Sequence, residues 1–172
     1  MTFQQIGVRY YKLNSNIPDP KIATTYSACF DLSYCADHAH EIHGYNTNNV
    51  KITKPLDILK TLRIFPGERL LVPTGLIFDI PIGYSMRIHP RSSTGYKLGL
   101  MLANNEGVVD ADYKQECFML MTNTTNTDIV IENNTRLCQA EIVPVVSVNL
   151  EQTPFKPENI SERIGGFGST GS

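Results

Sequence analysis

The stretch NNEGVVDADYKQE, residues 104–116, joins a polar turn, a short β-prone run and a cluster of acids. The NNEG tetrapeptide is typical of a hairpin turn, and the valines after it favour a strand. Asp110 and Asp112 lie two residues apart, so on a strand they share one face, with Tyr113 on the other. A carboxylate near phosphates can activate a water, and an aromatic ring can stack on a sugar or base. Taken alone, the stretch favours a simpler interpretation, a hairpin whose acids face solvent.

The segments on either side of this stretch predict an all-β fold. Most apolar runs are short, rich in Val, Ile, Tyr and Phe, and separated by Gly, Pro or Asn. The predicted strands are residues 7–13, 69–80, 84–90, 117–124, 128–132 and 137–150. Two windows are compatible with a helix: residues 52–62, where Pro55 limits the start, and a single turn around residues 92–99. Short strands with one minor helix indicate a β-barrel or a jelly-roll-like sandwich.

The bulk composition indicates one ordinary domain. With 172 residues, 41% hydrophobic content and a net charge of -2, the chain can bury a sizeable core. These values argue against a disordered chain and against a generic nucleic-acid binder. The first residues lack the basic and apolar blocks of a signal peptide, and no apolar run approaches transmembrane length. The four cysteines form no close pair, which favours reduced thiols. We expect a cytoplasmic protein, in the host cell if the source is a virus, that binds neither membrane nor nucleic acid directly.

A second polar stretch, residues 89–99, has the composition of a phosphate contact. Arg91 supplies a planar fork of donors, and Ser92 and Ser93 follow with two hydroxyls. An ordinary surface turn explains the same residues equally well.

Two further stretches carry single polar residues among apolar ones. Asp31, within SACFDLS, could assist a metal ion or cap a turn. RLCQAEIVP, residues 136–144, has the pattern of a strand on which Arg136 and Gln139 could meet a ligand.

The chain closes on RIGGFGSTGS, residues 163–172. Its glycines suit a phosphate-binding loop, but neither the lysine nor the helix of a P-loop follows. Pro154 and Pro157 precede it, and nothing there forms a core alone. The alternatives are a frayed end and a segment that orders against something else.

In their order and spacing, these stretches resemble the five motifs of the trimeric dUTPase family. The first is SACFDL, the second PRSSTGYKLGL, the third GVVDADYKQE, the fourth RLCQAEIVP and the fifth GGFGSTG. The third and fifth are the most specific, and the resemblance runs from about Ser27 to the last residue. It implies a jelly-roll-like distorted β-barrel over residues 1–153. A C-terminal arm, residues 154–172, would be exchanged between the subunits of a homotrimer.

The resemblance also implies a reaction. Family members hydrolyse dUTP to dUMP and pyrophosphate with Mg²⁺. On that pattern Asp110 activates the water that attacks the α-phosphorus, and Gln139 lies near the α-phosphate or this water. Asp31 reaches the magnesium ion through water molecules.

The substrate contacts implied by the resemblance come from four motifs. Asn104 and the backbone up to Gly107 read the uracil edge, and Tyr113 packs under the deoxyribose so that a 2'-hydroxyl has no room. Phe167 covers the uracil. The residues implied to hold the phosphates are Arg91, Ser92, Ser93, Arg163, Gly168, Ser169 and Thr170.

The chain departs from the family pattern at several positions. Cys29 and Gln115 stand where glycine is common, and residues 93–95 are atypical of the second motif. The family arginine lies five residues before the phenylalanine of the fifth motif. Here Glu162 holds that place and Arg163 follows it. We predict that Arg163 still serves the γ-phosphate.

An insertion of roughly twenty residues falls within residues 38–62, where the family has a short connection. It holds His38, His40 and His43, close to Cys35. Imidazole and thiolate groups are good ligands for a transition metal, although the spacing matches no standard site. A solvated loop is the favoured interpretation.

Two rival functions remain open. A dCTP deaminase of the same fold needs a glutamate in the strand after the third motif, but Leu120 stands there and Glu116 comes too early. A non-catalytic, regulatory nucleotide-binding relative is the other rival. The presence of Asp110, Tyr113 and Gln139 argues against it.

Overall fold

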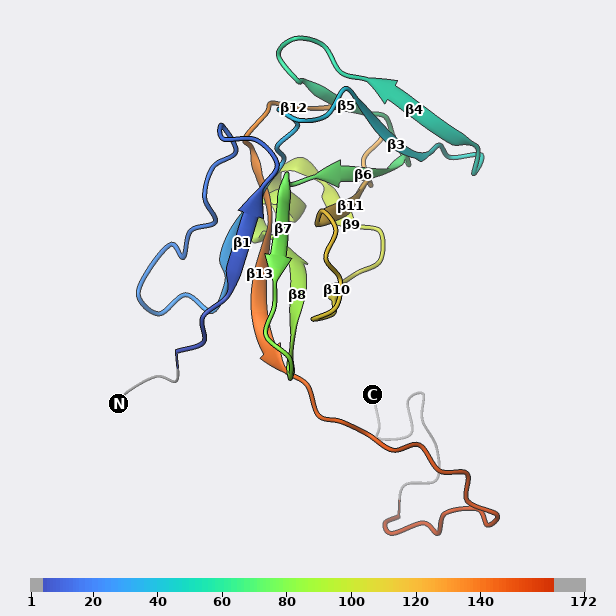
Figure 1. The fold of residues 1–172 in the computed structure, drawn as a ribbon. Helices are drawn as coiled ribbons and strands as arrows, with labels where there is room; N and C mark the ends of the chain where they lie inside the picture. The colour runs from blue at the N-terminus through green and yellow to red at the C-terminus, as the bar shows by residue number, and fades with distance from the viewer. Residues whose placement is uncertain (1–4, 163–172) are drawn as a thin grey trace.

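The structure, a computed structural model, describes residues 5–162, and strands make up almost all of its regular structure (Figure 1). The elements are β1 (Arg9–Lys12), β2 (Phe30–Ser33), β3 (Glu41–Tyr45), β4 (Lys51–Pro55), β5 (Leu62–Ile64), β6 (Arg69–Pro73), β7 (Leu76–Asp79), β8 (Tyr84–Pro90), η1 (Thr94–Leu98), β9 (Leu100–Leu102), β10 (Gly107–Val109), β11 (Phe118–Asn123), β12 (Ile129–Ile131) and β13 (Arg136–Pro144). The helical element η1 is five residues long. No helix in this part of the chain could cross a membrane.

Antiparallel pairing joins the strands into four sheets. The two larger sheets have the orders β10-β8-β13-β2 and β4-β3-β6-β11-β9, and β1-β7 and β12-β5 form two-stranded ribbons. The pairing of strands far apart in sequence, such as β2 with β13, is what a jelly-roll-like arrangement requires. The all-β prediction with one short helix is confirmed.

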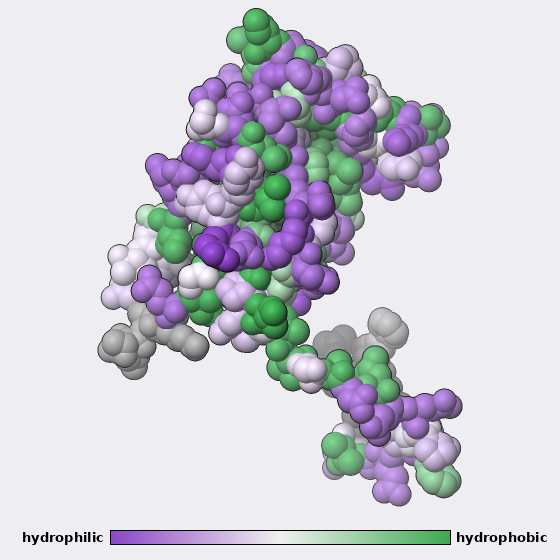
Figure 2. Space-filling model, viewed as in Figure 1, coloured by the Kyte–Doolittle hydropathy of each residue, from purple (hydrophilic) through white to green (hydrophobic). Residues whose placement is uncertain are grey.

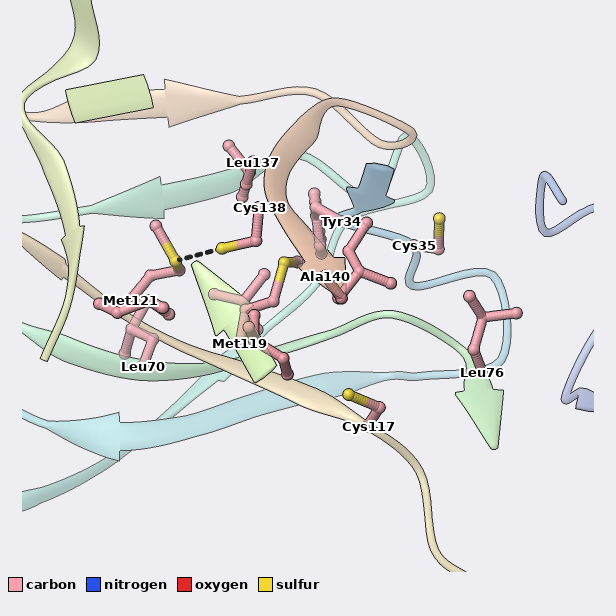
Figure 3. Packing of buried hydrophobic residues seen from close by; sticks show 14 of the residues in the cluster. Tyr34, Cys35, Leu70, Leu76, Cys117, Met119, Met121, Leu137, Cys138 and Ala140 are labelled. Atoms are coloured by element: carbon pink, nitrogen blue, oxygen red, sulfur yellow. Dashed lines mark hydrogen bonds between the residues drawn. The ribbon is translucent and has the colours of Figure 1, made fainter. Parts of the chain in front are cut away.

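The hydrophobic core lies between the two larger sheets. Met119 and Met121 of β11 alternate with outward-facing neighbours and point toward β13, where Cys138 lies opposite (Figure 3). The sulfur atoms of Cys138 and Met121 are 3.6 Å apart. Fully burying a side chain of this size stabilises the fold by about 1.5–3 kcal/mol. The sheets that carry the polar motifs are therefore fixed by a packed interior.

Most of the predicted strands are present, with shifted ends. β8 covers the predicted residues 84–90, and the helical turn falls within residues 92–99 as expected. The strand predicted over residues 137–150 ends at Pro144. After it, Val145 donates one backbone hydrogen bond to Gly83 and no further pairing follows in the described chain.

Two predictions about the inserted segment are wrong. Residues 52–62 form no helix, because residues 51–55 are the strand β4, paired with β3. The favoured solvated loop is also incorrect from residue 41 on, since β3 joins β6 of the large sheet through Gly44 and Leu70. The insertion is thus a β-hairpin that extends the five-stranded sheet (Figure 1).

The turn at residues 103–106 does not close a hairpin. β9 pairs with β11, whereas β10 pairs with β8, so the turn carries the chain from one large sheet to the other. The third motif therefore starts where the chain crosses between the sheets.

After β13 the chain leaves the body. Residues 145–162 have no strand or helix and every one is exposed. Figures 1 and 2 show this segment standing away from the body, with hydrophobic side chains among hydrophilic ones. Val146, Leu150 and Ile160 are among the exposed apolar residues. The division into residues 1–153 and 154–172 stays a prediction.

Candidate active site

One cluster of predicted site residues forms where β2, β13 and β8 lie side by side. Gln139 is paired with Asp31 on one side and with His89 on the other. The Asp31 carboxylate accepts a hydrogen bond from Arg136 Nη1 at 2.8 Å and forms an ion pair with Arg91, whose Nε lies 2.9 Å from Oδ1, and its side chain is only 14% exposed. Three strands therefore place one carboxylate, one carboxamide and two guanidinium groups together.

The turn after β8 fixes Arg91 and the serines that follow it. The Arg91 carbonyl accepts the backbone N–H groups of Thr94 and Gly95 at 3.0 and 3.2 Å, which starts the helical turn. Ser92 and Ser93 lie on the first part of this turn, next to the cluster, and Ser92 is exposed. This arrangement can present hydroxyl and guanidinium donors to an anion.

A second cluster lines a pocket of about 420 Å³ between the two large sheets. Asn104, Gly107, Asp110 and Tyr113 of the third motif are among its lining residues. A Cβ at Gly107 would lie 3.0 Å from Ile88 Cβ, so this glycine lets β10 approach β8 closely. The Asp110 side chain is exposed, as a group that meets a substrate must be.

The two acids of the third motif do not lie on a strand, contrary to the prediction. β10 ends at Val109, and Tyr113 N–H donates to the Asp110 carbonyl at 3.2 Å, which closes a turn. The Tyr113 hydroxyl donates to the Glu116 carbonyl at 2.9 Å. Burial raises the pKa of Tyr113, so the hydroxyl keeps its proton. The turn directs Asp110 and the Tyr113 ring to one pocket, which a strand would not do.

A larger pocket, of about 970 Å³, touches the same loop through Ala111 and Asp112. Its lining holds two cations, Arg9 and Lys114, which both pair with Asp79, and a second acid, Asp112, balances their charge. Hydrogen bonds from Lys114 and Arg9 hold the pKa of Asp79 below its usual range. The smaller pocket is therefore the better candidate for chemistry.

The two clusters meet along β8. β10 pairs with β8 from Gly107–Ile88 to Val109–Met86, and Glu106 Oε1 lies 3.7 Å from Nδ1 of His89, the residue that pairs with Gln139. Asp110 follows the end of β10 that lies beside Met86, whereas Arg91 follows the opposite end of this pair, after Pro90. Asp110 and Arg91 therefore lie toward opposite ends of the β8–β10 pair.

The described residues place the histidines of the insertion apart from one another. His38 Nε2 lies 3.0 Å from Glu116, whereas His43 Nδ1 lies 3.1 Å from Thr53 on the exposed face of the hairpin. Within residues 5–162 no group of three or more His, Cys, Asp or Glu side chains could hold a metal ion. The structure thus gives the transition-metal hypothesis no support.

Sequence reasoning missed three of these relationships. Nothing in the sequence pairs Asp31 with Arg91 or Arg136, and Glu116 was considered only as a misplaced deaminase acid. The position predicted for that acid holds Leu120, which pairs with Leu71 in β11 and β6. The fifth-motif residues Arg163, Phe167, Gly168, Ser169 and Thr170 lie outside the described residues, and their roles stay predictions.

Sequence comparison relates this chain to nucleotide hydrolases. The dUTPase family model matches residues 55–171, which hold the second to fifth motifs. The deoxyuridine 5'-triphosphate nucleotidohydrolase of Brucella suis biovar 1 is 41% identical over 109 residues, covering 63% of this chain and 69% of the relative. That of Rhizobium meliloti is 37% identical over 134 residues, covering 78% and 82%.

Comparison with solved structures gives the same fold. The dUTPase of Staphylococcus bacteriophage 80alpha, solved with dUPNHPP, has a TM-score of 0.75 at 20% identity, covering 98% of this chain and all of that one. The dUTPase from Streptococcus mutans has a TM-score of 0.60 at 25% identity, covering 84% and 99%. Since the family model matches well over half of the residues, the chain belongs to the dUTPase family.

Proposed function

We propose that this protein hydrolyses dUTP to dUMP and pyrophosphate, the activity that its relatives' names describe. The observation that carries the proposal is the pocket in which Asn104, Gly107, Asp110 and Tyr113 meet. These four residues lie inside the segment that matches the family and come from β10 and the turns before and after it.

The pocket has the chemistry for the base, the sugar and the attacking water. Asp110 would accept a proton from a water whose oxygen attacks the α-phosphorus, while the bond to the bridging oxygen breaks and pyrophosphate leaves. Tyr113 would lie under the deoxyribose and exclude a 2'-hydroxyl. Asn104 and the backbone up to Gly107 would read uracil, in a space narrowed by the close contact with Ile88.

The cluster at β2, β8 and β13 has the chemistry for the phosphates. Arg91 uses Nε on Asp31, so its two Nη groups can donate to phosphate oxygens, with Ser92 and Ser93 beside them. Gln139 would contact the α-phosphate or the attacking water. The ion pairs with Asp31 hold the Arg91 guanidinium in place before substrate arrives.

The Asp31 carboxylate, together with the phosphate oxygens of the substrate, fits a magnesium ion that would arrive bound to the triphosphate. Mg²⁺ keeps several waters and needs one or two carboxylates besides phosphate oxygens. Asp31 would hold it through water, since each carboxylate oxygen lies beside an arginine and keeps a lone pair for a water of the ion's shell. The bound ion would supply neutralisation of the triphosphate charge.

Asp110 and Arg91 lie toward opposite ends of the β8–β10 pair, and this placement, with the resemblance to the trimeric family, supports an active site shared between subunits. We propose a homotrimer in which one subunit provides the third motif and a neighbour provides Asp31, Arg91 and Gln139. The arm, residues 154–172, would bring Arg163, Phe167 and residues 168–170 from a subunit across the interface.

The deciding experiment measures pyrophosphate release from dUTP, UTP, dCTP and dTTP with Mg²⁺. We expect release from dUTP alone. Asp110→Asn should lower kcat by at least about a thousandfold yet leave binding of the non-hydrolysable analogue dUPNHPP intact. Ammonia released from dCTP would instead establish a deaminase, and dUTP binding without hydrolysis by the wild-type protein would establish a non-catalytic relative.

A further inference from the structure

The Glu116 side chain is held by two separate segments of the chain. Its Oε2 accepts a hydrogen bond from His38 Nε2 at 3.0 Å, and its Oε1 accepts from the Gly75 N–H at 2.8 Å. Both side chains are largely buried, with 17% of His38 and 13% of Glu116 exposed. A carboxylate with one donor on each oxygen, out of bulk water, has a fixed orientation.

The segment that carries His38 is itself anchored. Cys35 N–H donates to the Pro73 carbonyl at 2.9 Å, and Ala36 N–H donates to Asn133 Oδ1 at 2.9 Å. Gly75 has φ +69°, and a Cβ there would overlap Ile17 and lie 3.4 Å from His38 Cε1. His38 therefore projects from a rigid base into a space that Gly75 leaves open.

Only one nitrogen of the His38 ring has a partner among the described residues. Nδ1 is buried without a hydrogen bond, while Nε2 faces the Glu116 carboxylate, which can only accept when ionised. Nε2 thus carries the proton, and the ring serves as a single directed donor. A glutamine side chain can place an N–H near the same position.

The backbone of Glu116 in turn holds Tyr113. The Glu116 carbonyl accepts from the Tyr113 hydroxyl at 2.9 Å, and the next residue, Cys117, is fixed by its N–H to the Leu76 carbonyl at 2.8 Å and its carbonyl to Thr74 Oγ1 at 2.6 Å. Tyr113 as a whole residue is 41% exposed. The hydroxyl end of the Tyr113 ring is therefore held by the backbone of Glu116, and the Glu116 side chain is hydrogen-bonded to His38.

We propose that His38 and Glu116 are positioning residues that set the discrimination between deoxyribose and ribose at this site. This inference rests on the proposed function, in which the Tyr113 ring excludes a 2'-hydroxyl. The His38–Glu116 hydrogen bond holds the Glu116 backbone, and this backbone holds the Tyr113 ring where a ribose would clash. His38 lies in the insertion, outside residues 55–171 that match the family model, so the chain adds its own support to the pocket.

The test compares binding of dUPNHPP and of the corresponding ribonucleotide analogue by calorimetry. The measured quantity is the Kd of the ribonucleotide analogue divided by that of dUPNHPP. In His38→Ala we expect this ratio to fall about tenfold, because the ribonucleotide binds more tightly relative to the deoxyribonucleotide. His38→Gln should restore most of the ratio. His43→Ala is the matched control, because His43 lies exposed on the same insertion, where it has a hydrogen bond with Thr53 and an ion pair with Glu41, and it should leave the ratio unchanged.

Tyr113→Phe gives a second route, since it removes the hydroxyl and leaves the Glu116 side chain untouched. It should lower the ratio as His38→Ala does, and the double variant should show no further loss. A wild-type ratio in Tyr113→Phe overturns the inference whether or not His38→Ala folds. A wild-type ratio in a folded His38→Ala variant also overturns it. A wild-type protein that binds both analogues equally contradicts the proposed sugar pocket itself, which separates the two failures.

Discussion

Arg91 commits one of its three guanidinium nitrogens to Asp31 and keeps the other two for a ligand. A lysine keeps the charge but has a single nitrogen, so it cannot hold Asp31 and phosphate in a fixed fork. We expect Arg91→Lys to lower kcat/KM for dUTP roughly tenfold or more, as measured by pyrophosphate release. Arg63→Lys is the control, because Arg63 forms an exposed ion pair with Asp128 away from both clusters. Equal kcat/KM in Arg91→Lys and wild type would rule out a bidentate role.

The cysteines give a second prediction at the level of single residues. Burial raises the pKa of the Cys35, Cys117 and Cys138 thiols to about 12, so almost no thiolate exists at pH 8. Cys29 is partly exposed, and burial also raises the pKa of its thiol. Labelling the native protein with a thiol reagent at pH 8 should modify Cys29 alone and slowly, and all four thiols should react in denaturant. Fast reaction of two or more thiols in the native protein would contradict this packing.

Among the elements, the β3–β4 hairpin depends on one close backbone approach. A Cβ at Gly44 would overlap the Arg69 carbonyl oxygen in the neighbouring strand β6. Gly44→Ala must push β3 away from β6, and such overpacking costs about 1–3 kcal/mol. Urea unfolding should show this loss, whereas Gly7→Ala, with open space around the glycine, should be nearly neutral. An unchanged midpoint for Gly44→Ala would mean that β3 is not packed on β6 as described.

Gly44 also explains why the sequence does not predict the β3–β4 hairpin. β3 has only Ile42 and Gly44 on its buried face, and the outer positions are Glu41, His43 and Tyr45. A glycine at an inner position removes the apolar alternation by which a strand is recognised. By contrast β8 and β13 carry several buried apolar residues each, so the sequence predicts both strands, β8 with its full range and β13 with an end six residues too late.

The same distinction applies to the candidate site: contacts within one motif can be predicted from the sequence, and contacts between distant segments cannot. Asp110 and Tyr113 lie three residues apart in a distinctive motif, so their partnership is local. The bond from Arg91 to Asp31 spans sixty residues, and that from His38 to Glu116 spans seventy-eight. Contacts of this kind depend on which strands pair and in what register, and the composition of either stretch says nothing about that.

At the scale of the whole molecule, the β-sheet body and the segment after β13, residues 145–162, both indicate that several copies of the chain assemble. The apolar side chains of residues 145–162 are exposed in the described part of the chain, and Asp110 and Arg91 lie toward opposite ends of the β8–β10 pair. Both features are explained if the functional unit has several copies of the chain. In a symmetric ring each copy can meet its neighbour through a different surface and complete every site in the same way.

Mixing two inactive variants tests this arrangement directly. Asp110→Asn subunits keep the Arg91 cluster, and Arg91→Ala subunits keep the Asp110 pocket. If each site takes the two clusters from different subunits, random mixing gives each cluster the intact variant half of the time, so about one quarter of wild-type activity should return. The matched control mixes Asp110→Asn with Tyr113→Ala. Both residues line the same pocket in one chain, so every pocket remains defective and no activity should return. No recovery in the Asp110 and Arg91 mixture, once mixed oligomers are verified by mass, would place both clusters in one subunit. Recovery in the control would instead mean that one site takes Asp110 and Tyr113 from different subunits.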